Sequence, residues 1–234
     1  MKNKYVFILS LTFVCSMLLS LFSEGLKSKI LYNKDIDKKK NILQAVGIDS
    51  QIMSTDEILD SFNDNINEIT LDLQGNEFYD IGHDALETIE NKQTGEVKYF
   101  YNNKEYLPIY ISPKMNALIL PVSGKGLWSS LFGYFALDLE NYSTVKGITF
   151  YEHGETPGLG AEINKDWFKS SFIGKEIFSD NQLISINVAT AGKADKKNIH
   201  EVDGISGATI TGRGVETLLK RDLLRYEPYL RNNK

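Results

Sequence analysis

The sequence predicts an α+β protein in which one apolar N-terminal helix precedes a twisted, largely antiparallel sheet with helices packed on it. Three patterns predict this class. Residues 5–22 form an uncharged apolar run, several segments after residue 69 alternate apolar and polar residues, and residues 213–225 are typical of a helix. A sheet with helices against it is the α+β arrangement, because an apolar sheet face must be covered.

The apolar run Tyr5–Phe22 predicts a membrane-spanning anchor. It has eighteen positions and no charge, and only Ser, Thr and Cys interrupt it. A spanning helix needs about 20 apolar residues with a rise of about 1.5 Å each. A cleaved signal peptide has an apolar core of about 7–15 residues that ends in small residues, whereas this run ends in Leu21-Phe22-Ser23-Glu24. Lysines lie on both sides of the run, so the positive-inside rule leans only slightly towards an inside N-terminus.

Helices are predicted both before and after the strands. Leu26–Val46 has scattered apolar positions that favour one or two surface helices, and Gly47 is placed to end them. Ser54 is a suitable N-cap for a further helix that runs towards Phe62. The later predicted helices are Lys165–Phe172 and Arg213–Arg225.

The central part of the chain predicts strands, which Gly, Asn and Pro separate. Asn102-Asn103 is typical of a turn between two of them. The predicted strands are Ile69–Leu73, Val97–Tyr101, Pro108–Ser112, Ala117–Val122, Tyr134–Leu139, Val145–Tyr151 and Leu183–Thr190.

Composition excludes several classes of function. The formal charge of −5 argues against a nucleic-acid partner, because the one basic run, residues 38–40, is short. The single cysteine, Cys15, excludes a disulfide and a cysteine-based metal site within this chain. His83, His153 and His200 lack the spacing of metal ligands, so no metal site is predicted. The sequence has no P-loop, dinucleotide fingerprint or Ser-His-Asp pattern, so neither a catalytic residue nor an NADH site is predicted.

The first run that carries chemistry is Asp203-Gly204-Ile205-Ser206-Gly207-Ala208-Thr209, directly before the predicted helix at residue 213. It is a turn of small residues that opens onto a helix N-terminus. Such an end presents unsatisfied N–H groups and partial positive charge, which suit a phosphate. From chemistry alone, the alternative is a helix N-cap with spare hydroxyl groups.

This run resembles the flavinylation motif, Asp-Gly-x-Ser/Thr-Gly-Ala-Thr, of the FMN-binding domain family. The resemblance implies that Thr209 is esterified to the phosphate of FMN by a dedicated flavin transferase that uses FAD. It also places Asp203, Ser206, Gly207 and Ala208 at the cofactor. The sequence departs from the family at Gly212, where a serine is usual.

The second run is His153-Gly154-Glu155-Thr156-Pro157-Gly158-Leu159-Gly160-Ala161-Glu162, which alone predicts a tight turn after a strand. Its ETPGLG core is the other signature of the same family. The resemblance implies that this loop, including Gly158 and Gly160, lies against the flavin. Glu155 and Thr156 would make polar contacts there, and Leu159 an apolar one.

The third run, Pro121-Val122-Ser123-Gly124-Lys125-Gly126-Leu127-Trp128, resembles a segment of the C-subunit family (NqrC) of Na+-translocating NADH:quinone oxidoreductases. The G-subunit family of the Rnf complexes shares the other two runs but lacks this one. Trp128 is predicted at the cofactor, with a place in the core as the alternative. Residues 188–197 lack the basic pattern of the family, so Lys193 is only a candidate for a contact with the flavin.

The resemblance implies an electron-transfer subunit that relays electrons through covalent FMN, within a membrane complex that couples NADH oxidation and quinone reduction to Na+ export. The other subunits, the membrane and the flavin transferase would be its partners. The globular domain would lie on the outer, periplasmic side of a bacterial inner membrane. The expected organisation is an anchor over residues 1–25, membrane-proximal helices and the first part of the globular domain over 26–115, and an FMN-binding domain over 116–234. The alternatives are an Rnf-type subunit and an anchored extracytoplasmic binding module without a cofactor.

Overall fold

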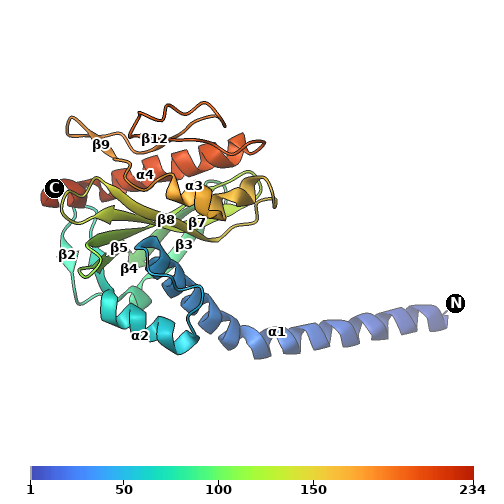
Figure 1. The fold of residues 1–234 in the computed structure, drawn as a ribbon. Coiled ribbons are helices and arrows are strands. Elements are labelled where there is room, and N and C mark those ends of the chain that lie inside the picture. Colours follow the sequence, from blue (N-terminus) through green and yellow to red (C-terminus); the bar gives the residue numbers. More distant parts are fainter. Residues whose placement is uncertain (1) are drawn as a thin grey trace. The chain divides into compact units, whose positions relative to one another are not determined.

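The computed structural model describes residues 2–234, which fall into two units, one up to Lys38 and one from Lys39 to Lys234 (Figure 1). The first unit belongs to a single helix, α1 (Lys2–Ala45), which is long and apolar enough to cross a membrane by length and composition. The predicted surface helices over residues 26–46 are therefore wrong as separate elements. They continue the apolar helix, because residues 23–45 contain no proline and only Gly25 to weaken it.

The second unit begins with the last turns of α1, whose apolar side is buried rather than on the surface. Gly47 ends α1 as predicted, with φ +86° and hydrogen bonds from its own N–H to Gln44 O and from Ile48 N–H to Leu43 O, both 3.0 Å. The predicted Ser54 cap is also confirmed. It starts α2 (Thr55–Asn65) with a reciprocal capping box to Glu57.

One antiparallel, open sheet forms the middle of the second unit, and its strand order is β2-β1-β5-β6-β7-β8, with β4 paired to β5 and β3 to β4. The long strands match the predicted ones within a few residues. Their bounds are β1 (Asn67–Leu71), β2 (Glu77–Phe78), β3 (Glu87–Asn91), β4 (Glu96–Tyr101), β5 (Lys104–Ser112), β6 (Ala117–Lys125), β7 (Ser130–Asp138) and β8 (Val145–Glu152). A 3-10 turn, η1 (His83–Ala85), lies between β2 and β3.

The turn predicted at residues 102–103 is confirmed, because Asn102 and Asn103 have φ of 49° and 60° between β4 and β5. Strand β3 was not predicted, because its sequence, Glu-Thr-Ile-Glu-Asn, does not alternate apolar and polar residues. In the structure all five of these residues are exposed. The predicted strand 183–190 is wrong as one element. It breaks at Ser185, whose φ is +66°, into β10 (Gln182–Leu183) and β11 (Asn187–Val188).

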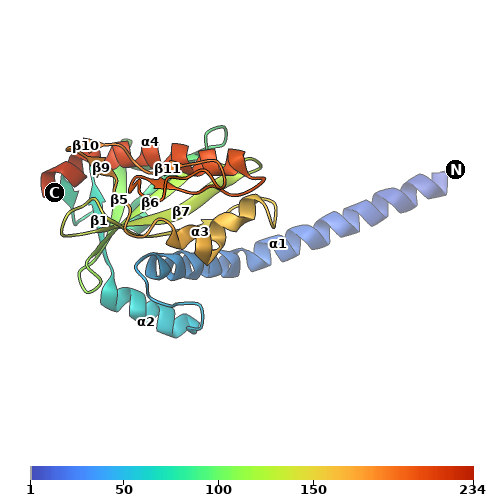
Figure 2. The ribbon, with the colours of Figure 1, turned by 45° about the horizontal axis from the view of Figure 1, so that its top comes forward.

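The C-terminal part of the chain places helix α4 (Thr209–Asn233) along one face of the sheet, with α2 on the opposite side in both views (Figure 1, Figure 2). The buried side chains of α4 share a core with strands β6 and β7. That core includes Leu118, Leu120, Phe135, Leu137, Val215, Leu219, Leu223 and Tyr226. The predicted helix at 165–172 is observed as the short helix α3 (Asp166–Ser170), which follows a 3-10 turn, η2 (Gly160–Asn164). Two further short strands are β9 (Phe178–Ser179) and β12 (Glu201–Val202).

Helix α4 begins four residues before the predicted start at Arg213. Its first turn, Thr-Ile-Thr-Gly, has low intrinsic helix propensity. Packing stabilises the turn instead. Gly214 lies so close to the carbonyl of Lys125 that a Cβ atom there would overlap it, and Gly212 lies against the side chain of Val188. Thr209 is therefore the first residue of a helix that the loop from β6 helps to hold.

Candidate functional site

Three loops meet at the N-terminus of α4, and they are the three runs singled out in the sequence. Residues 126–129 connect β6 to β7, residues 153–162 follow β8, and residues 203–208 lead into α4. Glu155 joins the second loop to the first and to the helix, and the third loop meets the second where Gly207 lies against Leu159. The fold thus brings together segments that are up to 84 positions apart in the sequence, as the separation of Lys125 and Thr209 shows.

Thr209 lies at the open end of α4. Its side chain is exposed, as are Ser206 and Gly207, whereas Ala208 is buried. Ala208 is the N-cap residue, and no side chain caps this helix end. The first N–H groups of a helix that lacks a side-chain cap carry partial positive charge and can bind an anion. An exposed hydroxyl group and an uncapped helix end are therefore adjacent.

Glu155 lies between the loop of Trp128 and the first turn of α4, and it is 5% exposed. Its carboxylate accepts the backbone N–H groups of Leu127 (3.1 Å), Trp128 (2.9 Å) and Ser129 (3.2 Å). It also accepts the hydroxyl of Thr211 at 2.6 Å. Burial raises the pKa of Glu155, but these four hydrogen bonds outweigh it and hold the pKa below the ordinary value of a glutamate. Glu155 is therefore an ionised group that joins the loop of Trp128 to the first turn of α4.

Glycines allow the close approach of the loops. A Cβ atom at Gly126 or Gly160 would lie within 2.7 Å of the Glu155 carboxylate, so only glycine leaves room for it. Gly207 has φ +74°, and a Cβ atom there would lie 2.9 Å from Leu159 Cδ2. Gly158 also has positive φ, +74°, at the tip of the second loop. The glycines of the motifs thus serve packing and turn geometry at the same place.

Large apolar side chains are exposed around the helix end. Trp128 is 69% exposed, so the alternative of a core tryptophan is wrong. Leu159 is 43% exposed and lies beside Gly207. Leu127 and Ile210 are exposed as well, one next to Trp128 and the other next to Thr209. Thr156 is exposed, and its carbonyl accepts the N–H of Leu159 at 3.1 Å, which shapes the turn of this loop.

Asp203, the first residue of the third loop, holds a neighbouring turn. Its carboxylate accepts the backbone N–H groups of Gly192 (3.0 Å), Lys193 (3.3 Å), Ala194 (3.4 Å) and Gly204 (3.2 Å). The side chain of Lys193 is exposed on this turn. The structure therefore places Lys193 next to the motif through its backbone.

Two features of the site were missed from the sequence. Thr211 and Ser129 were not predicted as site residues, although Thr211 binds Glu155 and the hydroxyl of Ser129 accepts the N–H of Gly154. The only signal for Thr211 was its position two residues after Thr209. Residues two apart on a helix face nearly opposite sides, so an exposed Thr209 implies that Thr211 faces the interior. Nothing local in the sequence pairs Thr211 with Glu155, which is 56 positions away.

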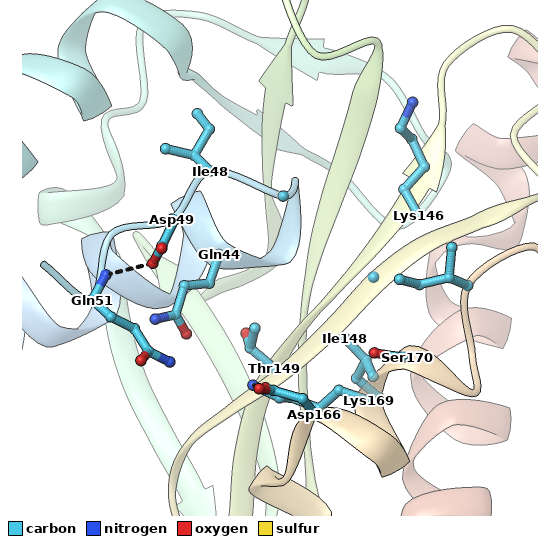
Figure 3. A pocket seen from close by; sticks show the side chains of 13 residues that line it. Gln44, Ile48, Asp49, Gln51, Lys146, Ile148, Thr149, Asp166, Lys169 and Ser170 are labelled. Carbon is cyan, nitrogen blue, oxygen red and sulfur yellow. Dashed lines mark hydrogen bonds and ion pairs between the residues drawn. The ribbon is translucent and has the colours of Figure 1, made fainter.

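A pocket of about 350 Å³ lies elsewhere in the second unit, between the end of α1, strand β8 and α3 (Figure 3). Its lining includes Gln44, Asp49, Lys146, Thr149 and Lys169. None of the predicted site residues lines it. The site at α4 is instead an open surface where the three loops surround the exposed Thr209, with Trp128 and Leu159 exposed beside it, and we call this surface the cradle.

Comparison with known proteins agrees with this geometry. The FMN-binding domain family matches residues 126–223, which include all three loops. The chain is 34% identical over 220 residues to the C subunit of the Na(+)-translocating NADH-quinone reductase of Yersinia pestis, and this match covers 88% of the chain and 82% of that protein. This chain belongs to the NqrC family. The family assignment made from the three runs is thus confirmed.

Other NqrC proteins extend the match. The NqrC protein of Pseudomonas aeruginosa is 32% identical over 211 residues, covering 83% of this chain and 80% of that protein. The crystal structure of the NqrC protein from Parabacteroides distasonis superposes with a TM-score of 0.70 at 30% identity, covering 88% of this chain and 96% of that one. The structure of Shewanella oneidensis NqrC has a TM-score of 0.68 at 24% identity, covering 86% and 98%, and supports the fold.

Proposed function

We propose that this chain is an electron-transfer subunit of a Na+-translocating NADH:quinone oxidoreductase and that it carries FMN as a phosphoester of Thr209. One observation carries the proposal: in a chain of the NqrC family, the exposed hydroxyl of Thr209 lies at the uncapped N-terminus of α4, inside the cradle of the three loops. The attachment consumes FAD. The hydroxyl oxygen of Thr209 forms a bond to the phosphorus of the FMN moiety, the pyrophosphate bond breaks, and AMP and the hydroxyl proton leave.

The residues of the cradle fit FMN. The partial positive charge of the α4 N-terminus suits the phosphodiester, and Ser206 and Gly207 lie exposed beside it. Trp128 and Leu159 offer apolar surface that can cover an aromatic ring system and exclude water from it. When bound, FMN supplies the redox chemistry, accepting and donating electrons. The protein holds the group in place and sets its surroundings.

Charged residues near the cradle have two different roles in this proposal. Glu155 and Asp203 act through the backbone groups that they bind, and so shape the loops of Trp128 and Lys193. The exposed ammonium group of Lys193 is the basic group available on its turn for the phosphate or the ring. Thr156, Gly158 and Gly160 form the turn that presents Leu159.

The rest of the function depends on the complex. The NADH site, the quinone site and the path of Na+ would lie on the other subunits, and a flavin transferase would attach the cofactor. The apolar run Tyr5–Phe22 of α1 would cross the bacterial inner membrane once and remain in the mature protein. The unit from Lys39 to Lys234 would then face the outer side.

The covalent bond is tested directly on the full chain. Produced with a flavin transferase and FAD, the protein should show flavin fluorescence on a denaturing gel, and its mass should rise by one FMN minus one water. A peptide that contains Thr209 should carry this mass. Production without the transferase is the matched control and should give no fluorescent band. A fluorescent band from that control, or a mass increase on a peptide outside residues 203–213, would contradict the proposal.

The orientation is tested with single cysteines. Cys15 is the only native cysteine, so Cys15→Ser provides a background without thiols. In this background Glu140→Cys, in the exposed turn after β7, should react with a membrane-impermeant maleimide in intact spheroplasts. Labelling only after the membrane is broken would place the unit inside. The Cys15→Ser protein alone should stay unlabelled in both conditions.

A further inference from the structure

Two threonine hydroxyls near the start of α4 have opposite surroundings. Thr209 is exposed, whereas Thr211 is 1% exposed and donates its hydroxyl to Glu155 Oε2 at 2.6 Å. Each helical residue turns by about 100°, so residues two apart face nearly opposite directions. Whichever threonine faces the interior therefore leaves the other on the surface.

The sequence of this first turn does not fix its own conformation. Thr209, Ile210 and Thr211 are β-branched, Gly212 and Gly214 follow, and no side chain caps the helix. All of these residue types disfavour a helix on their own account. Contacts from outside the helix must then fix which side of the first turn faces the interior. The hydrogen bond from Thr211 to the carboxylate of Glu155 is one of these contacts.

The same carboxylate also holds the loop of Trp128. Three consecutive N–H groups, those of Leu127, Trp128 and Ser129, donate to it. Hydrogen bonds to an ionised acceptor are about twice as strong as neutral ones. One buried group thus couples the rotation of the first turn to the position of the apolar loop beside it.

We infer that Glu155 is a positioning residue for cofactor attachment: by binding Thr211 and the loop 127–129, it turns Thr209 outward as the acceptor hydroxyl and forms the wall beside it. This inference rests on the proposed attachment at Thr209. In it, Glu155 touches neither the cofactor nor the reacting oxygen. It gives Thr211 and Thr209 different roles, although both positions carry a hydroxyl group.

The test measures the initial rate of flavin attachment to the full chain by purified transferase with FAD, from in-gel fluorescence. Glu155→Gln replaces one acceptor oxygen with an NH2 group that faces N–H donors, and Thr211→Val removes the hydroxyl while keeping the shape. Both should lower the rate about tenfold, which corresponds to roughly 1.4 kcal/mol. Thr211→Ser restores the hydroxyl and should keep the rate within about twofold of wild type. Glu140→Gln, at an exposed glutamate, is the matched control.

Amide hydrogen exchange in the protein without flavin supplies a second readout. In Glu155→Gln, the N–H groups of residues 127–129 should exchange faster, and residues 211–214 should do so in both variants, while residues 218–226 in the core part of α4 stay protected. Wild-type attachment rates and wild-type exchange in Thr211→Val and Glu155→Gln would overturn the inference. A Thr211→Ser protein that accepts flavin as slowly as Thr211→Val would overturn it as well. A wild-type chain that takes no flavin on Thr209 would instead refute the proposed attachment itself, and the exchange data would still report on Glu155.

Discussion

The Thr209→Ala protein is expected to carry no covalent flavin at all. The substitution removes the only exposed hydroxyl on the first turn of α4, and the nearby hydroxyl of Thr211 is buried and bound to Glu155. Fluorescence on a denaturing gel, after production with the transferase, should fall to the level of the protein produced without the transferase. Thr217→Ala, an exposed threonine eight residues further along the same helix, should be as fluorescent as wild type.

Loss of flavin in Thr209→Ala should not reflect unfolding. Thr209 is exposed, and surface substitutions of this kind change the free energy of unfolding by about 0.5 kcal/mol or less. Circular dichroism of the Thr209→Ala and wild-type proteins without flavin should therefore show the same thermal transition. A Thr209→Ala protein that folds normally and remains fluorescent would mean that another residue is the acceptor.

Asp222→Ala is expected to lower the free energy of unfolding of this protein strongly. Asp222 is 2% exposed, and its carboxylate accepts the N–H of Ser123 at 2.8 Å and the Nε and Nη2 groups of Arg221 at 2.8 and 2.7 Å. Removing one partner from a buried ion pair lowers the free energy of unfolding by roughly 3–5 kcal/mol. The lower end applies here, because Arg221 is partly exposed and can turn to water, and Arg225 keeps its 2.7 Å contact with Glu105.

This prediction is measured by urea unfolding of the full chain in detergent, followed by near-ultraviolet circular dichroism. Asp222→Asn should lower the free energy of unfolding less than Asp222→Ala does, since its amide oxygen can still accept the N–H of Ser123. Asp60→Ala, at an exposed aspartate of α2, should stay within about 0.5 kcal/mol of wild type. An Asp222→Ala protein as stable as Asp60→Ala would show that the buried ion pair has no net stabilising effect.

The sequence by itself determined the outline of this protein. An uncharged run of eighteen residues can form little other than an apolar helix, and the alternation in residues 97–151 predicted the long strands of the sheet because side chains of a strand alternate between its faces. The three glycine-rich runs identified the family, because their residue types and order are specific, and they led to the proposal that Thr209 is the acceptor. The helix end at Gly47 and the cap at Ser54 were also predictable, because each depends only on residues close to it in the sequence.

Only the tertiary structure decided how those runs work together. The start of α4 at Thr209 follows from packing against Lys125 and Glu155, which overrides the low helix propensity of its first turn. Asp203 and Glu155 were predicted to contact the cofactor, and in the structure their carboxylates bind backbone N–H groups of neighbouring loops. A sequence records which residues can accept hydrogen bonds, but the partners of Glu155 lie 26–56 positions away, and only the closed fold sets those distances.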